Sequence, residues 1–182
     1  PVRIYRPNPD SGESWYSEEE LKVFRLSSKS HWDVPIEIDG EVVHVLAAHP
    51  TPPGFDGIED WNGKRNHDEI RLFADYISDD DKDSSYIYDD NGNYGGIGGK
   101  GKAKFVIVGD YNAGPNGSGF SRAATMFTEN PLINNSVIPA SMGGNEQSFR
   151  QGGIDLESCG PAKYDTADFR GGRGNIRVDY GK

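Results

Sequence analysis

The sequence predicts a mixed α/β domain of the α+β kind, in which strands and helices share one core. Residues 33–39 alternate apolar and polar side chains, and residues 41–49 form an apolar run directly after them. A second apolar run at 104–108 reads KFVIV and is the clearest strand in the chain. Residues 66–77 lie between these runs and repeat apolar side chains at helical spacing. Strands separated by a helix indicate a sheet with helices packed outside it.

Composition supports a single acidic, loop-rich domain that covers residues 1–182. Its 29 Asp and Glu outnumber its 19 Lys and Arg, which gives a formal net charge of −10. This argues against a protein that coats nucleic acid, because such binding depends on excess Lys and Arg. Gly and Pro number 24 and 11, and no apolar run approaches the roughly 20 residues that cross a bilayer. The single cysteine, Cys159, excludes an internal disulfide, and the acidic composition suits a secreted protein.

The first strands follow a short helix and form a hairpin. Ser17 precedes three glutamates in a capping box, which predicts a helix through about Phe24. Asp39 and Gly40 are the two-residue signal for a tight hairpin between the strands at 33–39 and 41–49. The second strand therefore delivers His49 at its carboxyl end.

A Pro- and Gly-rich loop separates this hairpin from the longer helix. Residues 50–65 contain three prolines and three glycines, so the loop is predicted to hold neither helix nor central strand. Asn66 or Asp68 is expected to cap the helix, which runs to about Ile77. The predicted core stripe of this helix is Ile70, Phe73, Ala74 and Ile77.

Residues 78–103 predict a long acidic and Gly-rich loop. Asp89, Asn91 and Asn93 have the i, i+2, i+4 spacing that begins a calcium-binding loop, and their oxygens suit Ca²⁺. The sharp-turn glycine falls one position late and no Glu closes the loop. An exposed, solvated loop is the alternative interpretation of the same residues.

The rest of the chain has weaker signals. Residues 122–127 predict one or two helical turns, and 131–173 predict irregular, polar structure. Residues 175–180 alternate as a strand does and place Asp179 near its end.

Polar side chains that can carry chemistry follow the predicted strands. Asp110 and Asn112 come directly after the strand at 104–108, where a carboxylate can ligate an ion and an amide can hold a phosphate. His49 can act as an acid or base, because imidazole exchanges protons near neutral pH. The alternatives are an Asx turn, a structural histidine and, for Asp179, half of an Arg–Asp surface pair.

Taken in order, four segments resemble one family. The segments VHVLAAHPTPP, RNHDEIRLFADYI, FVIVGDYNAGP and NIRVDY are similar to the endonuclease/exonuclease/phosphatase superfamily, the DNase-I-like metal-dependent phosphoesterases. The segments RLSSKSHWDVPI and DTADF resemble a branch of large secreted bacterial members. This resemblance implies a two-sheet sandwich with helices outside, an active site at one end of the sheets, and Mg²⁺ or Mn²⁺ as cofactor.

The resemblance also implies roles for individual residues. His49 resembles the histidine that contacts the scissile phosphate or protonates the leaving group. Asp110 resembles the carboxylate that orients the attacking water or binds metal, and Asn112 the amide that holds a phosphate oxygen. Asp179 resembles the carboxylate that hydrogen-bonds a catalytic histidine. Second-tier candidates for substrate binding are Lys29, Asn66 and His67.

Two segments typical of the family are missing from this sequence. Nothing before His49 supplies the strand with the metal-binding Glu, and no Ser-Asp-His segment follows Asp179. We therefore expect a central portion of the domain without its first and last strands, completed by flanking segments or self-association. The predicted function is phosphoester hydrolysis, with a small ester or nucleic acid as substrate. The alternative is a non-catalytic binding or structural module on the same scaffold, with Ca²⁺ in its acidic loop.

Overall fold

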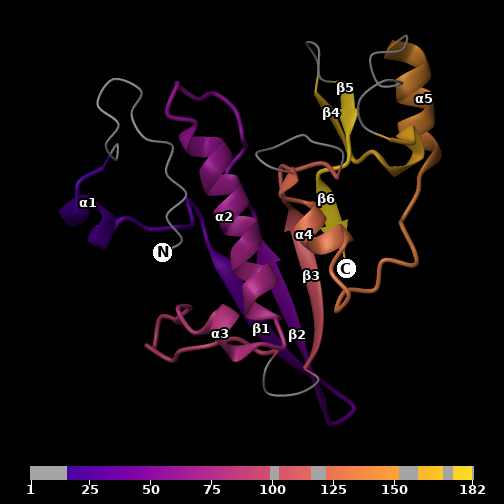
Figure 1. Ribbon diagram of the computed structural model, residues 1–182. Helices are drawn as coiled ribbons and strands as arrows, with labels where there is room; N and C mark the ends of the chain where they lie inside the picture. Colours follow the sequence, from indigo (N-terminus) through magenta and orange to yellow (C-terminus); the bar gives the residue numbers. More distant parts are fainter. Residues whose placement is uncertain (1–15, 99–102, 116–121, 152–159, 170–173, 182) are drawn as a thin grey trace.

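The computed structural model describes residues 16–98, 103–115, 122–151, 160–169 and 174–181 (Figure 1). None of the helices described there is long and apolar enough to cross a membrane. The elements in chain order are α1 (Glu18–Val23), β1 (His31–Ile38), β2 (Glu41–Ala48), α2 (Trp61–Tyr76), α3 (Asp81–Ser84), β3 (Lys104–Asp110), α4 (Thr125–Thr128), α5 (Met142–Gln151), the 3₁₀ turn η2 (Ala162–Tyr164), β4 (Ala167–Phe169), β5 (Gly174–Ile176) and β6 (Asp179–Gly181).

A mixed four-stranded sheet in the order β1-β2-β3-β6 organises the fold. The outer pairs β1–β2 and β3–β6 are antiparallel, and the central pair β2–β3 is parallel. A separate two-stranded sheet joins β4 to β5. Figure 1 shows α2 lying lengthwise over the large sheet, with β4, β5 and α5 grouped on the other side of the molecule. The predicted mixed α/β class is confirmed.

The hairpin between β1 and β2 forms where the sequence predicts it. Ile38 pairs with Glu41, which leaves a two-residue turn. Asp39 and Gly40 have φ angles of 52° and 80°, the left-handed values that a type I′ turn requires at both positions. The capping box at Ser17 is also confirmed, since its hydroxyl accepts from the Glu20 N–H and the Glu20 carboxylate accepts from the Ser17 N–H.

The core lies between the sheet and α2. Leu46 of β2 and Ile107 of β3 are fully buried against Ile70, Phe73 and Ile77 of the helix region. A parallel pair such as β2–β3 needs a crossover connection, and α2 lies in that connection. Three of the four residues in the predicted helical stripe are thus confirmed as fully buried core.

The opposite face of the sheet is apolar and exposed. The register places alternate residues of β1 opposite apolar residues of β2, and these lie beside apolar residues of β3. The nine apolar side chains on this face are Trp32, Val34, Ile36, Ile38, Val43, Val45, Ala47, Val106 and Val108. Trp32 is 61 % exposed, and every other member remains exposed or partly exposed. A sheet face of this composition is typical of a surface that packs against another layer.

The helix α2 begins at Trp61, earlier than the start predicted at 66–68. Tertiary contacts explain the extra turn. The Trp61 and Phe24 rings pack with centroids 5.0 Å apart, and the Arg65 Nε donates to the Leu26 carbonyl over 2.6 Å. These contacts stabilise a first turn that the Gly- and Pro-rich composition of the segment does not predict.

The prediction of irregular structure over 131–173 is wrong for α5 and the short elements that follow it. Gly143 and Gly144 lie within α5, although glycine is a weak helix former. A Cβ on Gly144 would lie 2.0 Å from the Ala162 carbonyl oxygen, so close packing against η2 requires glycine there. The packing partner therefore determines this helix rather than the local propensity.

The strand predicted at 175–180 divides between two sheets. Residues up to Ile176 belong to β5 and residues from Asp179 belong to β6. The predicted loop at 78–103 also contains structure, namely α3 and a β-bridge between Tyr88 and Tyr94. Its residues 99–102 lie outside the described part of the chain.

Candidate active site

The candidate active site lies where the parallel strands β2 and β3 end. Parallel strands carry their carboxyl ends to the same edge of a sheet, so the residues after them become neighbours. His49 follows β2, and its Nε2 lies 3.6 Å from Oδ2 of Asp110 at the end of β3. The two side chains are 50 % and 36 % exposed. The predicted histidine and carboxylate therefore meet at an edge that solvent reaches.

The exit from β3 fixes the orientation of Asp110 and Asn112. Gly109 has a φ of 145°, and a Cβ there would lie 2.0 Å from the Ala48 carbonyl oxygen. Asp110 Oδ1 accepts from the Asn112 backbone N–H over 2.9 Å. The other carboxylate oxygen, Oδ2, therefore faces His49. Asn112 has a φ of 50°, and its Nδ2 donates to the Pro50 carbonyl over 3.0 Å. The Asx turn weighed as an alternative is thus present, and it is what positions the carboxylate.

Asp179 lies directly across the sheet from Asp110. The two residues are register partners in the antiparallel pair β3–β6, so their side chains point to the same face. The Asp179 backbone N–H donates to Thr166 Oγ1 over 3.0 Å, which connects β6 to the segment before β4. Opposed carboxylates repel each other, and a cation between them relieves the repulsion. The register therefore places the two aspartates side by side at this edge.

Asn66 on α2 joins the two strand ends. It is fully buried, and its Nδ2 donates to the carbonyls of Thr51 and Tyr111 over 2.8 and 2.9 Å. Thr51 lies two residues after His49, and Tyr111 lies next to Asp110. Asn66 is therefore a positioning residue that holds both loops at a fixed separation.

Glu69 contributes to the same support and was not predicted. Its buried carboxylate accepts from the Ser28 N–H over 2.9 Å and from the Thr51 N–H over 2.5 Å. Both acceptor bonds join segments that are distant in sequence. The only sequence signal was its place in the segment RNHDEIRLFADYI, one turn after Asn66.

Of the other second-tier candidates, Lys29 lies at the cluster. Its Nζ donates to the His49 backbone carbonyl over 3.2 Å, so a cation stands beside the candidate acid or base. His67 lies on α2, and its Nδ1 is 3.1 Å from Oδ1 of the neighbouring Asp68. Its side chain is mostly buried there.

The residues of the predicted calcium loop form a closed turn. Asp89 Oδ1 accepts from the backbone N–H groups of Asn91 and Asn93 over 2.9 and 2.8 Å. Its Oδ2 accepts from Asn93 Nδ2 over 2.8 Å, and the hydrogen bonds from Asn93 lower the pKa of Asp89. Within the described ranges, no three His, Cys, Asp or Glu side chains converge as a metal site. Binding of Ca²⁺, Mg²⁺ or Mn²⁺ stays a prediction.

Comparison with known proteins leaves the chain without a matching relative. No protein-family model, curated protein or solved structure matches it. The interpretation of the site therefore depends on the residues and their geometry. These place an imidazole, two opposed carboxylates and an amide at one exposed edge of a sheet.

Proposed function

We propose that the chain belongs to a divalent-metal-dependent phosphoester hydrolase, an extracellular nuclease or phosphodiesterase or a portion of one. One observation carries this proposal. His49, Asp110 and Asp179 come from three separate parts of the sequence and meet at one open edge. The resemblance to the DNase-I-like superfamily names the same residues as the reacting groups.

The donor set at this edge fits a hard divalent cation. Asp110 and Asp179 present carboxylate oxygens from opposed strands, and Mg²⁺ and Mn²⁺ prefer such oxygen ligands. When bound, the metal neutralises the charge that develops on the phosphate. Asp110 and Asp179 are the residues that would hold it.

The remaining steps belong to the side chains of the cluster. Asp110 Oδ2 orients the water that attacks phosphorus and accepts the proton that this water loses. His49 Nε2, exposed and 3.6 Å from Asp110, donates a proton to the departing oxygen. Asn112 uses one amide hydrogen on the Pro50 carbonyl, and its second hydrogen holds a phosphate oxygen. Lys29 attracts the anionic substrate to this edge of an acidic protein.

The uncovered sheet face supports a DNase-I-like sandwich as the scaffold. Nine apolar side chains on one face are what a second sheet would cover at the usual spacing of about 10 Å. The helix α2 occupies the other face, as the outer helices of such a sandwich do. The proposed architecture is thus one sheet of a two-sheet domain.

Hydrolysis of bis-p-nitrophenyl phosphate and of DNA tests the proposal. The natural protein is assayed with Mg²⁺, with Mn²⁺ and with EDTA, beside the variants His49→Ala and Asp110→Asn. Each variant is expected to lose at least about a hundredfold in kcat, since both act on the reacting groups. Glu37→Gln, an exposed carboxylate at the far end of β1, is the matched control and keeps full activity. Absence of metal-dependent cleavage of both substrates would refute the proposal.

The second candidate is a non-catalytic binding or structural module on the same scaffold. The exposed apolar face favours it, because such a surface also suits self-association or a protein partner. Calcium calorimetry together with light scattering tests this candidate. A monodisperse monomer that binds no Ca²⁺ would count against it.

A further inference from the structure

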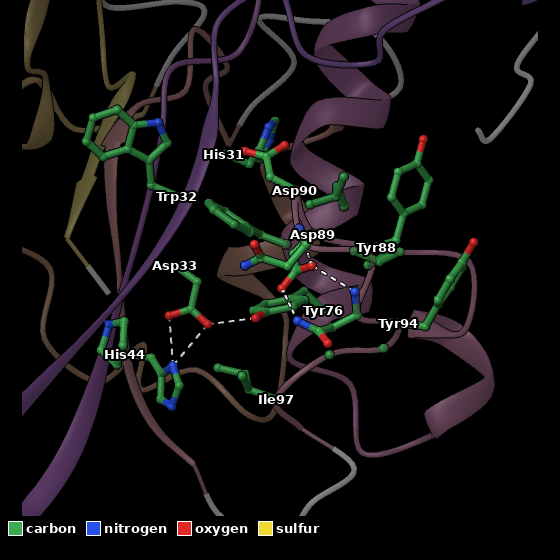
Figure 2. Close-up of a pocket in the computed structure, with 18 of the residues that line it drawn as sticks. His31, Trp32, Asp33, His44, Tyr76, Tyr88, Asp89, Asp90, Tyr94 and Ile97 are labelled. Carbon is green, nitrogen blue, oxygen red and sulfur yellow. Dashed lines mark hydrogen bonds and ion pairs between the residues drawn. The ribbon is translucent and has the colours of Figure 1, made fainter. Parts of the chain in front are cut away.

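A second candidate site lies on the β1 side of α2, in a cavity of about 1000 Å³. Its lining includes none of His49, Asp110, Asn112 or Asp179. A volume of this size is ordinary for a site that takes a small organic ligand. Its lining comes from β1, the end of α2 and the loop over 87–97, as Figure 2 shows.

One wall of the cavity is a hydrogen-bonded group of three side chains. Asp33 Oδ1 lies 2.7 Å from Nδ1 of His44, and the Tyr76 hydroxyl donates to Asp33 Oδ2 over 2.6 Å. Burial, followed by this bond to Asp33, raises the pKa of Tyr76. The hydroxyl therefore stays protonated as a donor, and Figure 2 shows the three joined on the β1 side. The carboxylate of Asp33 is occupied within the wall.

The loop over 87–97 forms the opposite wall. A β-bridge pairs Tyr88 with Tyr94, and their rings lie 5.6 Å apart between centroids. Both side chains are largely exposed, at 67 % and 69 %. In Figure 2 both rings lie on the far side of the cavity from Asp33, Asp89 lies between them and Asp33, and Asp90 is drawn nearer to His31. The loop thus contributes two aromatic rings and two carboxylates to the lining of the cavity.

This loop is attached firmly to the end of α2. The Gly95 N–H donates to the Ile87 carbonyl over 3.0 Å, and the Ile97 N–H donates to the Tyr76 carbonyl over 2.9 Å. A Cβ on Gly96 would lie 2.1 Å from the Tyr76 carbonyl oxygen, so only glycine allows this approach. The backbone of this loop is therefore preformed, and binding does not have to order it.

The charges of the cavity select the class of ligand. Its described lining contains three carboxylates, two histidines, of which His44 pairs with Asp33, and neither Lys nor Arg. Such a surface repels phosphates and other anions. It attracts cations, and tyrosine faces add a cation–π contribution.

We propose that this cavity binds an organic cation, an ammonium or guanidinium group carried on an apolar body. Asp90 faces the cation directly, and the rings of Tyr88 and Tyr94 contact its apolar surface. Asp33 and Asp89 hold their carboxylates in hydrogen bonds within the walls and contribute their negative field. The three carboxylates and the aromatic rings of the described lining favour a cation, and a neutral sugar is the alternative that the experiment separates.

Choline and its neutral isostere 3,3-dimethylbutan-1-ol test the proposal on the whole chain. Binding is followed by chemical-shift changes in ¹H–¹⁵N NMR spectra, with methyl glucoside as a third probe. We expect choline to shift the amides of 87–97 saturably and to bind at least tenfold more tightly than the isostere. Tyr94→Ala and Asp90→Asn should each weaken choline binding at least threefold. Tyr164→Ala, a tyrosine on η2 outside the cavity, should leave it unchanged.

Several results would overturn the proposal. Equal affinity for choline and its isostere would show that charge does not select the ligand. Tighter binding of the glucoside would assign the cavity to neutral sugars. If the chemical-shift changes do not saturate with choline, the cavity does not bind it. The same conclusion follows if Tyr94→Ala keeps the native spectrum elsewhere and leaves the choline-induced shifts unchanged. Asp90→Asn changes only an exposed side chain, so the fold is expected to be preserved. This variant therefore tests the contribution of the Asp90 charge to choline binding.

Discussion

Glu69→Ala removes the buried carboxylate that joins α2 to two distant segments. The backbone N–H groups of Ser28 and Thr51 lose their acceptor, at 2.9 and 2.5 Å in the native chain. Each unsatisfied buried donor costs about 1–3 kcal/mol, and the Ser28 donor is only partly buried. We therefore expect a loss of about 2–5 kcal/mol in the free energy of unfolding. Glu69→Gln keeps one oxygen acceptor and turns an NH₂ toward the other donor, so it should lose about half as much.

Urea unfolding followed by circular dichroism measures both losses. The transition midpoint should fall in the order native, Glu69→Gln, Glu69→Ala, with unchanged slope. Glu37→Gln, which removes an exposed carboxylate, should unfold as the native protein does. A loss below about 1 kcal/mol for Glu69→Ala would refute the argument, because surface substitutions already lie within about 0.5 kcal/mol.

Three further predictions follow from single residues. Gly109→Ala should lower the free energy of unfolding in urea by at least about 2 kcal/mol, because φ is 145° and the new Cβ would meet the Ala48 carbonyl. An unchanged free energy of unfolding would contradict the geometry of this strand exit. Asn66→Ala should lower kcat for phosphodiester cleavage at least tenfold while far-ultraviolet circular dichroism is unchanged, and full activity would remove its positioning role. Burial lowers the pKa of His31 below 6.5, so the folded protein favours the neutral imidazole. The stability that the neutral imidazole contributes is complete above pH 6.5 and is lost as the pH falls toward the pKa of the folded state. The free energy of unfolding should fall more steeply from pH 7 to 5 in the native chain than in His31→Asn, and equal slopes would contradict this.

The parts of the fold that the sequence predicted are those determined locally. Asp39 and Gly40 require left-handed backbone angles, so the hairpin and its register follow from two residues. The apolar run that became β3 is too short and too β-branched for another interpretation. The capping box at Ser17 depends on contacts three residues apart.

The parts that the sequence did not predict depend on distant partners. The first turn of α2 forms because Trp61 packs on Phe24, and α5 tolerates Gly144 because η2 approaches it closely. Neither partner is evident in a local window. Apolar spacing predicted the core stripe of α2 well, but it could not show where the helix begins.

The same distinction holds for the candidate site. His49 and Asp110 could be predicted, since both follow clear strands whose ends meet in a parallel pair. Glu69 could not, because its role depends on backbone groups of Ser28 and Thr51, which no periodicity relates to it. The cavity beside Tyr88 and Tyr94 depends on a loop whose composition predicted a calcium-binding loop or an exposed, solvated segment, and no cavity.

Paramagnetic line broadening by Mn²⁺ tests the central claim most directly, because it locates a divalent ion without requiring turnover. In ¹H–¹⁵N spectra of the natural chain, substoichiometric Mn²⁺ should broaden the amides around Asp110 and Asp179 first. Asp110→Asn should remove that broadening, and competition by Mg²⁺ should reverse it. Broadening confined to the acidic residues 79–90, with the amides of Asp110 and Asp179 unchanged, would contradict the assignment of this edge as a metal-dependent phosphoester site.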